Sequence, residues 1–178
     1  MRFLALLRGI NVGGNSIIRM VELKTALEKD GFKNPKTYIQ SGNVFIDSES
    51  KPDKVARDIE ASIKKHFNLD VSVAVFTQKQ WQAVIDQAPD KWGKDKDWKH
   101  NLLILLEPYD INQVIDSIGE LKPDIEFMVA GEGVLYQSLS ISLFGRTTTG
   151  KLASKSIYKR MTIRNFNTTT KLLNLFED

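Results

Sequence analysis

The first half of the chain alternates short apolar runs with stretches of helical periodicity. Apolar runs predict strands over residues 2–7 and 71–76, and strand-like runs at 37–40 and 43–46 flank a tight hairpin signal, Ser41-Gly42. Leu23 and Leu27 lie four residues apart and predict a short helix. Apolar residues then recur every four positions from Val55 to Phe67, which predicts a second, amphipathic helix. The predicted order is strand, helix, two strands, helix, strand.

The second half repeats this order. It predicts a strand over residues 102–106, a helix capped by Asp110 and Gln113 and ended by Gly119, and a hairpin formed by residues 125–129 and 134–139. A third helix carrying Leu152, Ile157 and Met161 follows, then a short strand at 161–164 and a final helix around Leu172. We therefore predict an α+β fold of two ferredoxin-like βαββαβ subdomains, a duplication of topology without visible sequence identity between the halves.

A connector separates the two predicted subdomains. We assign residues 1–77 to the first, 78–100 to the connector and 101–178 to the second with its C-terminal helix, all within one compact structural unit. Thr77 and Gln80 are spaced to cap a connector helix that carries Trp81. The polar loop that follows holds Trp92 and Trp98, which either anchor the loop or form a surface for a partner.

The amino-acid composition excludes several kinds of chemical site. The 178 residues suffice for a sizeable core, and the absence of cysteine excludes disulfides, thiolate metal sites and cysteine nucleophiles. No metal or cofactor is expected, because no motif for either is present and only His66 and His100 could supply imidazole. The apolar run after Arg2 spans five residues, too few for a signal peptide, and no stretch has the length of a membrane span. We expect a cytoplasmic protein without membrane attachment, and its oligomeric state stays open.

Two loops of the first half carry candidate ligand-binding residues. Arg8-Gly9-Ile10-Asn11-Val12-Gly13-Gly14 follows the first strand, where glycines allow close approach of a ligand and Arg8 and Asn11 supply donors. Its spacing is not that of a dinucleotide-binding loop, and a structural turn explains it equally well. The predicted hairpin adds Gln40, Ser41 and Asn43, with Tyr38 on the same strand face as Gln40.

These motifs resemble a known family. The stretch LLRGINVGG, then Met20-Val21-Glu22-Leu23 and TYIQSGNVF, is similar to the amino-terminal signature of the bacterial domain of unknown function 1697 family (DUF1697). Residues 162–173 (TIRNFNTTTKLL) are similar to its closing motif, which more often has Trp at the position of Phe166. The resemblance implies the two-subdomain α+β fold. Because the family is uncharacterised, it points to no particular activity. Its marked positions here are Arg8, Asn11, Gly13, Gly14, Gln40, Ser41, Gly42, Asn43, Arg164, Asn165 and Asn167.

Charge is distributed unevenly along the chain. From Gly133 to Phe176 there are seven lysines and arginines and no Asp or Glu, although the whole chain carries only +3. Lys151, Lys155 and Lys159 are spaced to line one face of the predicted helix that carries Leu152 and Ile157. Such a patch attracts polyanions, and the alternative is an ordinary solvated face.

The same region contains a phosphate-loop pattern, G-x-x-x-x-G-K, at Gly145–Lys151. Leu152 stands where a nucleotide-hydrolysing enzyme has the Ser or Thr that holds magnesium, and too little chain follows for its parallel sheet. A simpler phosphate grip remains, made of backbone amides, Arg146 and Lys151.

The function we predict is binding of a phosphate-bearing or other anionic ligand, such as a nucleotide, a sugar phosphate or a nucleic acid, with no membrane partner. The candidate ligand-binding residues are Arg8, Asn11, Gly13, Gly14, Gln40, Ser41, Asn43, Arg146, Lys151, Lys155, Arg164, Asn165 and Asn167. One alternative is an enzyme acting on a small metabolite, with His100 or Tyr38 as acid or base. Another is a protein-interaction module that uses Trp92 and Trp98.

Overall fold

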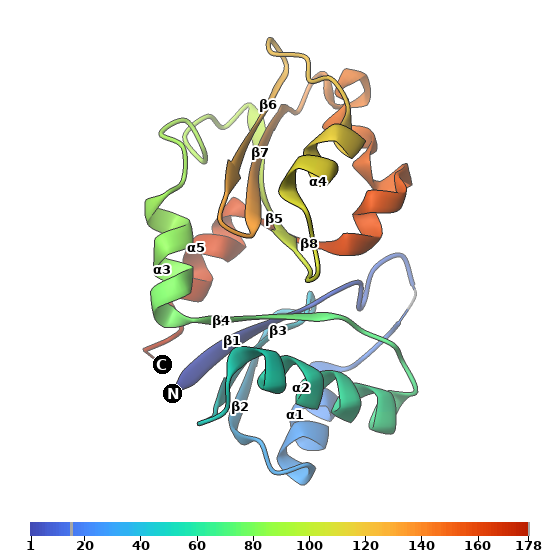
Figure 1. The fold of residues 1–178 in the computed structure, drawn as a ribbon, viewed down its shortest axis with the longest axis vertical. Coiled ribbons are helices and arrows are strands. Elements are labelled where there is room, and N and C mark those ends of the chain that lie inside the picture. The colour runs from blue at the N-terminus through green and yellow to red at the C-terminus, as the bar shows by residue number, and fades with distance from the viewer. Residues whose placement is uncertain (15, 178) are drawn as a thin grey trace. The chain divides into compact units, whose positions relative to one another are not determined.

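The structure, a computed structural model, describes residues 1–14 and 16–177 (Figure 1). They form two compact units, residues 1–82 with 174–177 and residues 83–173. Each unit contains one four-stranded antiparallel sheet. No helix among these residues is long and apolar enough to cross a membrane.

The first unit has the ferredoxin-like order of elements. These are β1 (Arg2–Leu7), α1 (Met20–Lys29), β2 (Lys33–Tyr38), β3 (Asn43–Asp47), α2 (Pro52–Phe67) and β4 (Val73–Thr77). The sheet order is β2-β3-β1-β4, so β1 is central and pairs antiparallel with β3 and β4. Helices α1 and α2 lie side by side on one face of this sheet (Figure 1).

Alternation along β1 builds a core on each face of the first sheet. Phe3, Ala5 and Leu7 point toward the helices and join the buried leucines and isoleucines of α1 and α2. On the opposite face, Phe45 meets the ring of Phe176 edge-on with 5.1 Å between ring centroids. Both faces of the sheet are therefore covered, and the chain's last turns contribute to the first unit.

The second unit repeats the topology. Its elements are β5 (Trp98–Leu105), α4 (Ile111–Ile118), β6 (Glu126–Gly131), β7 (Val134–Ser140), the 3₁₀ helices η1 (Phe144–Arg146), η2 (Thr149–Ser154) and η3 (Ser156–Arg160), β8 (Met161–Asn165) and α5 (Phe166–Asn174). The sheet order β6-β7-β5-β8 matches that of the first unit position by position. The predicted duplication of an α+β, ferredoxin-like topology is thereby confirmed.

The caps predicted at Thr77 with Gln80, at Asp110 and at Gly119 are confirmed as well. Helix α3 (Gln78–Asp86) begins with a reciprocal pair, in which the Gln80 amide donates to Thr77 Oγ1 at 3.2 Å and the Thr77 amide to Gln80 Oε1 at 2.9 Å. Asp110 accepts from the amides of Asn112 and Gln113 at the start of α4. Gly119 ends α4 with a φ of 90°, a conformation that glycine adopts without strain.

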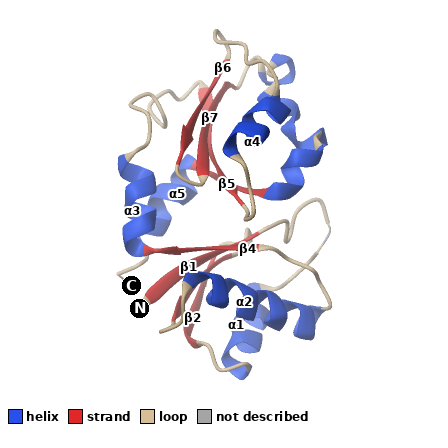
Figure 2. Cartoon of the chain, viewed as in Figure 1, coloured by secondary structure: helices blue, strands red, loops and turns tan. Residues whose placement is uncertain are grey.

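The prediction of a regular helix carrying Leu152, Ile157 and Met161 is wrong. Three short 3₁₀ helices follow β7 instead (Figure 2), and Lys155 stands between two of them in extended conformation, with φ −91° and ψ 146°. The spacing of Lys151, Lys155 and Lys159 therefore does not place them on one helix face. Glycine and serine, which favour turns over helix interiors, interrupt the segment at Gly150 and at residues 154 and 156.

Candidate anion-binding site

The glycine loop after β1 is fastened at its start. The Leu7 amide donates to the Gly42 carbonyl at 2.8 Å, and the Arg8 amide donates to the Ser72 carbonyl at 2.9 Å. Beyond that point the backbone takes left-handed conformations at positions 9, 11, 13, 14 and 16. Gly13 and Gly14 are exposed, and a Cβ added to either would meet no other atom. These glycines are open to solvent, as a ligand-binding loop requires, and Arg8 is half-buried at its base.

Asn11 has a structural task in this loop. Its Nδ2 donates to the carbonyl oxygens of Ile18 at 2.9 Å and Gln40 at 2.8 Å, while its Oδ1 accepts from the Ile18 amide at 2.9 Å. Both ends of the side-chain amide are thereby used. Asn11 fixes the loop against itself and against the hairpin, and its φ of 55° is one that asparagine tolerates better than most residues.

The hairpin residues are also held internally. Strand β2 ends at Tyr38, so Gln40 lies in the turn, and the prediction that it shares a strand face with Tyr38 is wrong. Asn43 is fully buried, and its Nδ2 donates to the Tyr38 carbonyl at 2.9 Å and to Ser41 Oγ at 3.1 Å. A Cβ at Gly42 would lie 2.8 Å from side-chain atoms of Leu7 and Ile10. The structure thus brings together the two predicted loops of the first unit through tight packing and backbone contacts.

The stretch from Gly133 to Phe176, called the basic segment below, contains cations of two kinds. Lys155 donates through Nζ to the last carbonyls of α4, at Ser117 and Ile118, and Arg160 donates to the Pro108 carbonyl at 2.5 Å. These two cations stabilise the fold around α4. Arg146, Lys151 and Lys159 are instead exposed on η1, η2 and η3, and none forms an ion pair with a carboxylate in the part of the chain that the structure describes.

The G-x-x-x-x-G-K loop already holds an anion from the protein itself. Glu126 is fully buried, and its carboxylate accepts from the Thr148 amide at 2.7 Å and from the Thr149 amide and hydroxyl at 2.8 and 2.7 Å. The Lys122 amide adds a fourth hydrogen bond at 3.1 Å. Burial raises the pKa of Glu126, but these hydrogen bonds outweigh it and leave the pKa below its ordinary value. Amides of this loop therefore bind Glu126 where a phosphate grip would need them.

The closing motif supplies one buried cation and a helix cap. Arg164 on β8 is 5% exposed, and its Nη1 donates to Thr162 Oγ1 at 2.9 Å and to the Ile163 carbonyl at 2.8 Å. Burial lowers the pKa of Arg164 to about 10, so the guanidinium stays charged at neutral pH. Asn165 Oδ1 accepts from the Thr168 amide at 2.8 Å and caps α5, while Asn167 is exposed on its first turn.

The candidate residues for an enzyme, His100 and Tyr38, and for a protein-interaction surface, Trp92 and Trp98, are all buried or half-buried. His100 is buried, with Nδ1 2.7 Å from Ser138 Oγ and Nε2 2.9 Å from the Asp95 carbonyl. Trp92 is 4% exposed and donates to the Asn101 carbonyl at 3.2 Å. Trp98 is half-buried, and Tyr38 is half-buried at the end of β2.

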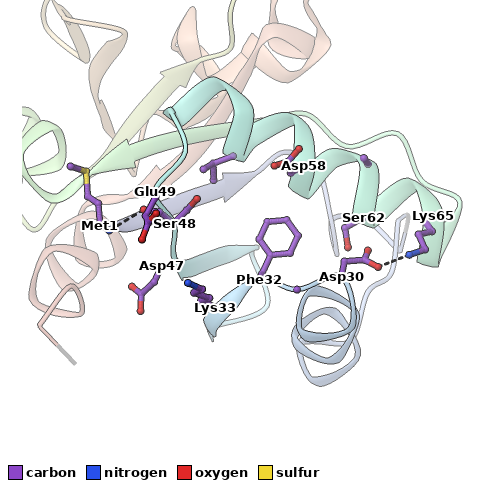
Figure 3. A pocket seen from close by; sticks show the side chains of 13 residues that line it. Met1, Asp30, Phe32, Lys33, Asp47, Ser48, Glu49, Asp58, Ser62 and Lys65 are labelled. Carbon is purple, nitrogen blue, oxygen red and sulfur yellow. Dashed lines mark hydrogen bonds and ion pairs between the residues drawn. The ribbon is translucent and has the colours of Figure 1, made fainter.

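A cavity in the first unit was not predicted from the sequence. It has a volume of about 510 Å³ and lies between α2 and the segments at Asp30–Lys33 and Asp47–Glu49 (Figure 3). Its lining comes from Met1 and from three further stretches of sequence, none with a motif, so only the folded chain reveals it. In the described ranges 1–14 and 16–177, no group of three or more His, Asp or Glu side chains could hold a metal ion.

The fold and these loops define a class of two-unit α+β proteins with duplicated ferredoxin-like sheets. The chain belongs to the family described as "Protein of unknown function (DUF1697)", which matches residues 1–136. The solved structure of the conserved bacterial protein SP0830 from Streptococcus pneumoniae is similar, with a TM-score of 0.87 and 27% sequence identity over 98% of both chains. No curated protein matches the chain.

Proposed function

We propose that this protein binds a phosphate-bearing or other anionic ligand. The observation that carries the proposal is the set of exposed cations Arg146, Lys151 and Lys159 on three successive 3₁₀ helices. No carboxylate lies between positions 133 and 176 of the sequence to neutralise them. Exposed cations without carboxylate partners attract polyanions and release counterions when a phosphate replaces them.

An extended ligand fits this arrangement better than a small one. Glu126 occupies the Thr148 and Thr149 amides of the G-x-x-x-x-G-K loop, and the amides of residues 146, 147, 150 and 151 donate within the segment, so side chains rather than amides must contact a phosphate there. Arg146, Lys151 and Lys159 stand on separate turns, which favours successive phosphates of one chain, as in a nucleic acid. The Arg8–Gly14 loop of the first unit, with exposed Gly13 and Gly14, is proposed by itself as a second anion-binding surface.

The test is fluorescence anisotropy of a short fluorescein-labelled oligonucleotide, titrated with the full chain from about 50 to 200 mM salt. We expect saturable binding that weakens steeply with salt. The triple variant Arg146→Ala, Lys151→Ala, Lys159→Ala should bind about tenfold more weakly, with a salt slope smaller by up to about 3. The matched control is Lys91→Ala, Lys94→Ala, Lys96→Ala, which removes the same charge from exposed positions elsewhere in the second unit.

Equal weakening by the control would show that net charge alone attracts the probe and would reject the basic segment as a site. Absence of binding at low salt would reject the nucleic-acid form of the proposal. ATP and inorganic phosphate then serve as the small probes, with thermal unfolding as the readout. Arg8→Ala should reduce the shift in unfolding temperature that these probes cause, and an unchanged shift would remove Arg8 from the site.

A cytoplasmic location is likewise a proposal, made from the sequence alone.

A further inference from the structure

The basic segment carries an exposed aromatic side chain among its cations. Phe144 is 43% exposed and begins η1, the short helix that also carries Arg146. Ile141, three residues earlier, is 56% exposed, and its carbonyl accepts from the Phe144 amide at 3.4 Å. Apolar side chains scattered singly over a surface need no explanation, but two large ones close together beside cations indicate a surface that a ligand covers.

The ring of Phe144 is supported by two other elements of the second unit. Lys99 on β5 places its Nζ over the ring, 5.7 Å from the ring centroid. Gly150 on η2 lies next to the ring, because a Cβ added there would be 3.5 Å from a ring carbon and 2.8 Å from the Phe144 carbonyl oxygen. The missing side chain of Gly150 thus lets η1 and η2 pack closely, and the ring is held at the surface with part of its area open to solvent.

The cations around this ring have no carboxylate partner. Lys99, Arg146 and Lys151 are all exposed, and none of them forms an ion pair with a described carboxylate. Asp97, which precedes β5 and is the acidic residue nearest to Lys99 in sequence, forms no ion pair with it either. An aromatic ring therefore lies beside positive charges that are available to phosphates.

This combination distinguishes between the two forms of nucleic acid. A duplex turns its phosphates outward and keeps its bases paired and stacked, so a ring beside its backbone meets no base face. A single strand offers its base faces, and proteins that bind single strands combine cations along the backbone with aromatic rings on which the bases stack. Stacking of this kind tolerates any base sequence, because every base has a π face.

We propose that Phe144 stacks on a base of a single-stranded nucleic acid whose neighbouring phosphates are bound by Arg146 and Lys151. The proposal rests on the anion binding proposed for the basic segment and specifies the form of the ligand. Lys99 has two roles in it, because it supports the ring and adds a positive charge beside the bound strand.

The test is fluorescence anisotropy of the full chain at one fixed salt concentration with three labelled probes of equal length. They are a single-stranded oligothymidylate, an abasic strand with the same phosphates and no bases, and a duplex. We expect the wild-type chain to bind the oligothymidylate about fivefold or more tightly than the abasic strand. Phe144→Leu keeps an apolar side chain and removes the π face, so it should abolish this preference and leave the affinities for the abasic strand and the duplex unchanged.

Phe144→Trp restores an aromatic face. It should retain the preference, and the oligothymidylate should quench the fluorescence of the added indole. The matched control is Val129→Ala on β6, since Val129 is 42% exposed and lies outside the basic segment. This variant should keep the wild-type preference.

Equal affinity of the wild-type chain for the oligothymidylate and the abasic strand would overturn the stacking role and leave the cation surface intact. A preference that survives Phe144→Leu, or that Val129→Ala also loses, would overturn it as well. Equal weakening of all three probes by Phe144→Leu would attribute the loss to altered packing of η1 and would likewise reject stacking. Failure of every probe to bind the wild-type chain would instead reject nucleic-acid binding by the basic segment, and the stacking role with it.

Discussion

The carboxylate of Glu126 binds both the backbone amide and the hydroxyl group of Thr149, at 2.8 and 2.7 Å. Residues 23 positions apart in sequence are thereby tied together inside the second unit. From Thr149 the connection continues through its carbonyl to the buried Gln137 Nε2 at 3.5 Å, and Gln137 Oε1 accepts from Asn101 at 2.7 Å. This chain of buried polar groups fixes the basic segment onto its sheet.

Replacement of Glu126 should therefore destabilise the second unit. We expect Glu126→Gln to lower the free energy of unfolding by about 2 kcal/mol at neutral pH, because an amide cannot accept from all of these donors. The pKa of Glu126 is lower in the folded chain than its ordinary value of 4.5. Its contribution is thus complete above pH 4.5 and is lost as pH falls through the folded pKa. Urea unfolding at several pH values measures this, and a difference that does not shrink in acid would contradict it.

Gly42 and Gly13 offer a matched pair in the first unit. Both have positive φ, 75° and 60°, but an added Cβ is 2.8 Å from Leu7 Cβ at Gly42 and meets nothing at Gly13. We expect Gly13→Ala to cost about 1 kcal/mol from backbone strain alone. Gly42→Ala should cost about 3 kcal/mol, because overpacking against Leu7 and Ile10 adds to the strain. Thermal and urea unfolding measure both, and equal losses would show that the hairpin packs less tightly than described.

Much of the architecture was predictable from local pattern. The four-residue spacing from Val55 to Phe67 predicts α2, and the polar caps Thr77 and Asp110 predict where α3 and α4 begin. The repeated order of elements predicts both sheets, since strand order follows from topology once each hairpin is placed.

The basic segment was harder to predict because its conformation depends on a distant residue. The lysines at positions 151, 155 and 159 have helical spacing, yet Glu126 on β6 binds the amides that start η2 and sets the turn. The cavity was invisible for a related reason. Its lining comes from α2 and from segments such as Asp30–Lys33 that only the fold brings together, and no sequence pattern encodes a space between elements.

The side chain of Asn11 should stabilise the loop after β1. Its side chain makes three hydrogen bonds, and its backbone has a φ of 55°. Asn11→Gly keeps the left-handed backbone accessible and loses only the side-chain bonds, so it should cost about 1–2 kcal/mol. Asn11→Ala adds backbone strain and should cost about 1 kcal/mol more. Urea unfolding of both variants measures the two contributions. Equal stability of Asn11→Gly and the wild type would refute the structural role.

Within the basic segment, Lys155 should contribute to stability and hardly to ligand binding. Its Nζ reaches the carbonyls at the C-terminal end of α4, where a cation is favoured by the unpaired carbonyls and the helix dipole. Lys155→Met keeps the aliphatic stem and removes the charge, so it should lower stability by about 1 kcal/mol while changing oligonucleotide affinity little.

Lys151→Met is the matched variant, because Lys151 is exposed and forms no ion pair with a described residue. It should leave stability unchanged and weaken oligonucleotide binding by roughly threefold. Anisotropy and urea unfolding of both variants distinguish the roles. If Lys155→Met weakened binding as much as Lys151→Met, the Lys155 ammonium would have to leave α4 in the complex. The cap would then be a resting contact that the ligand displaces.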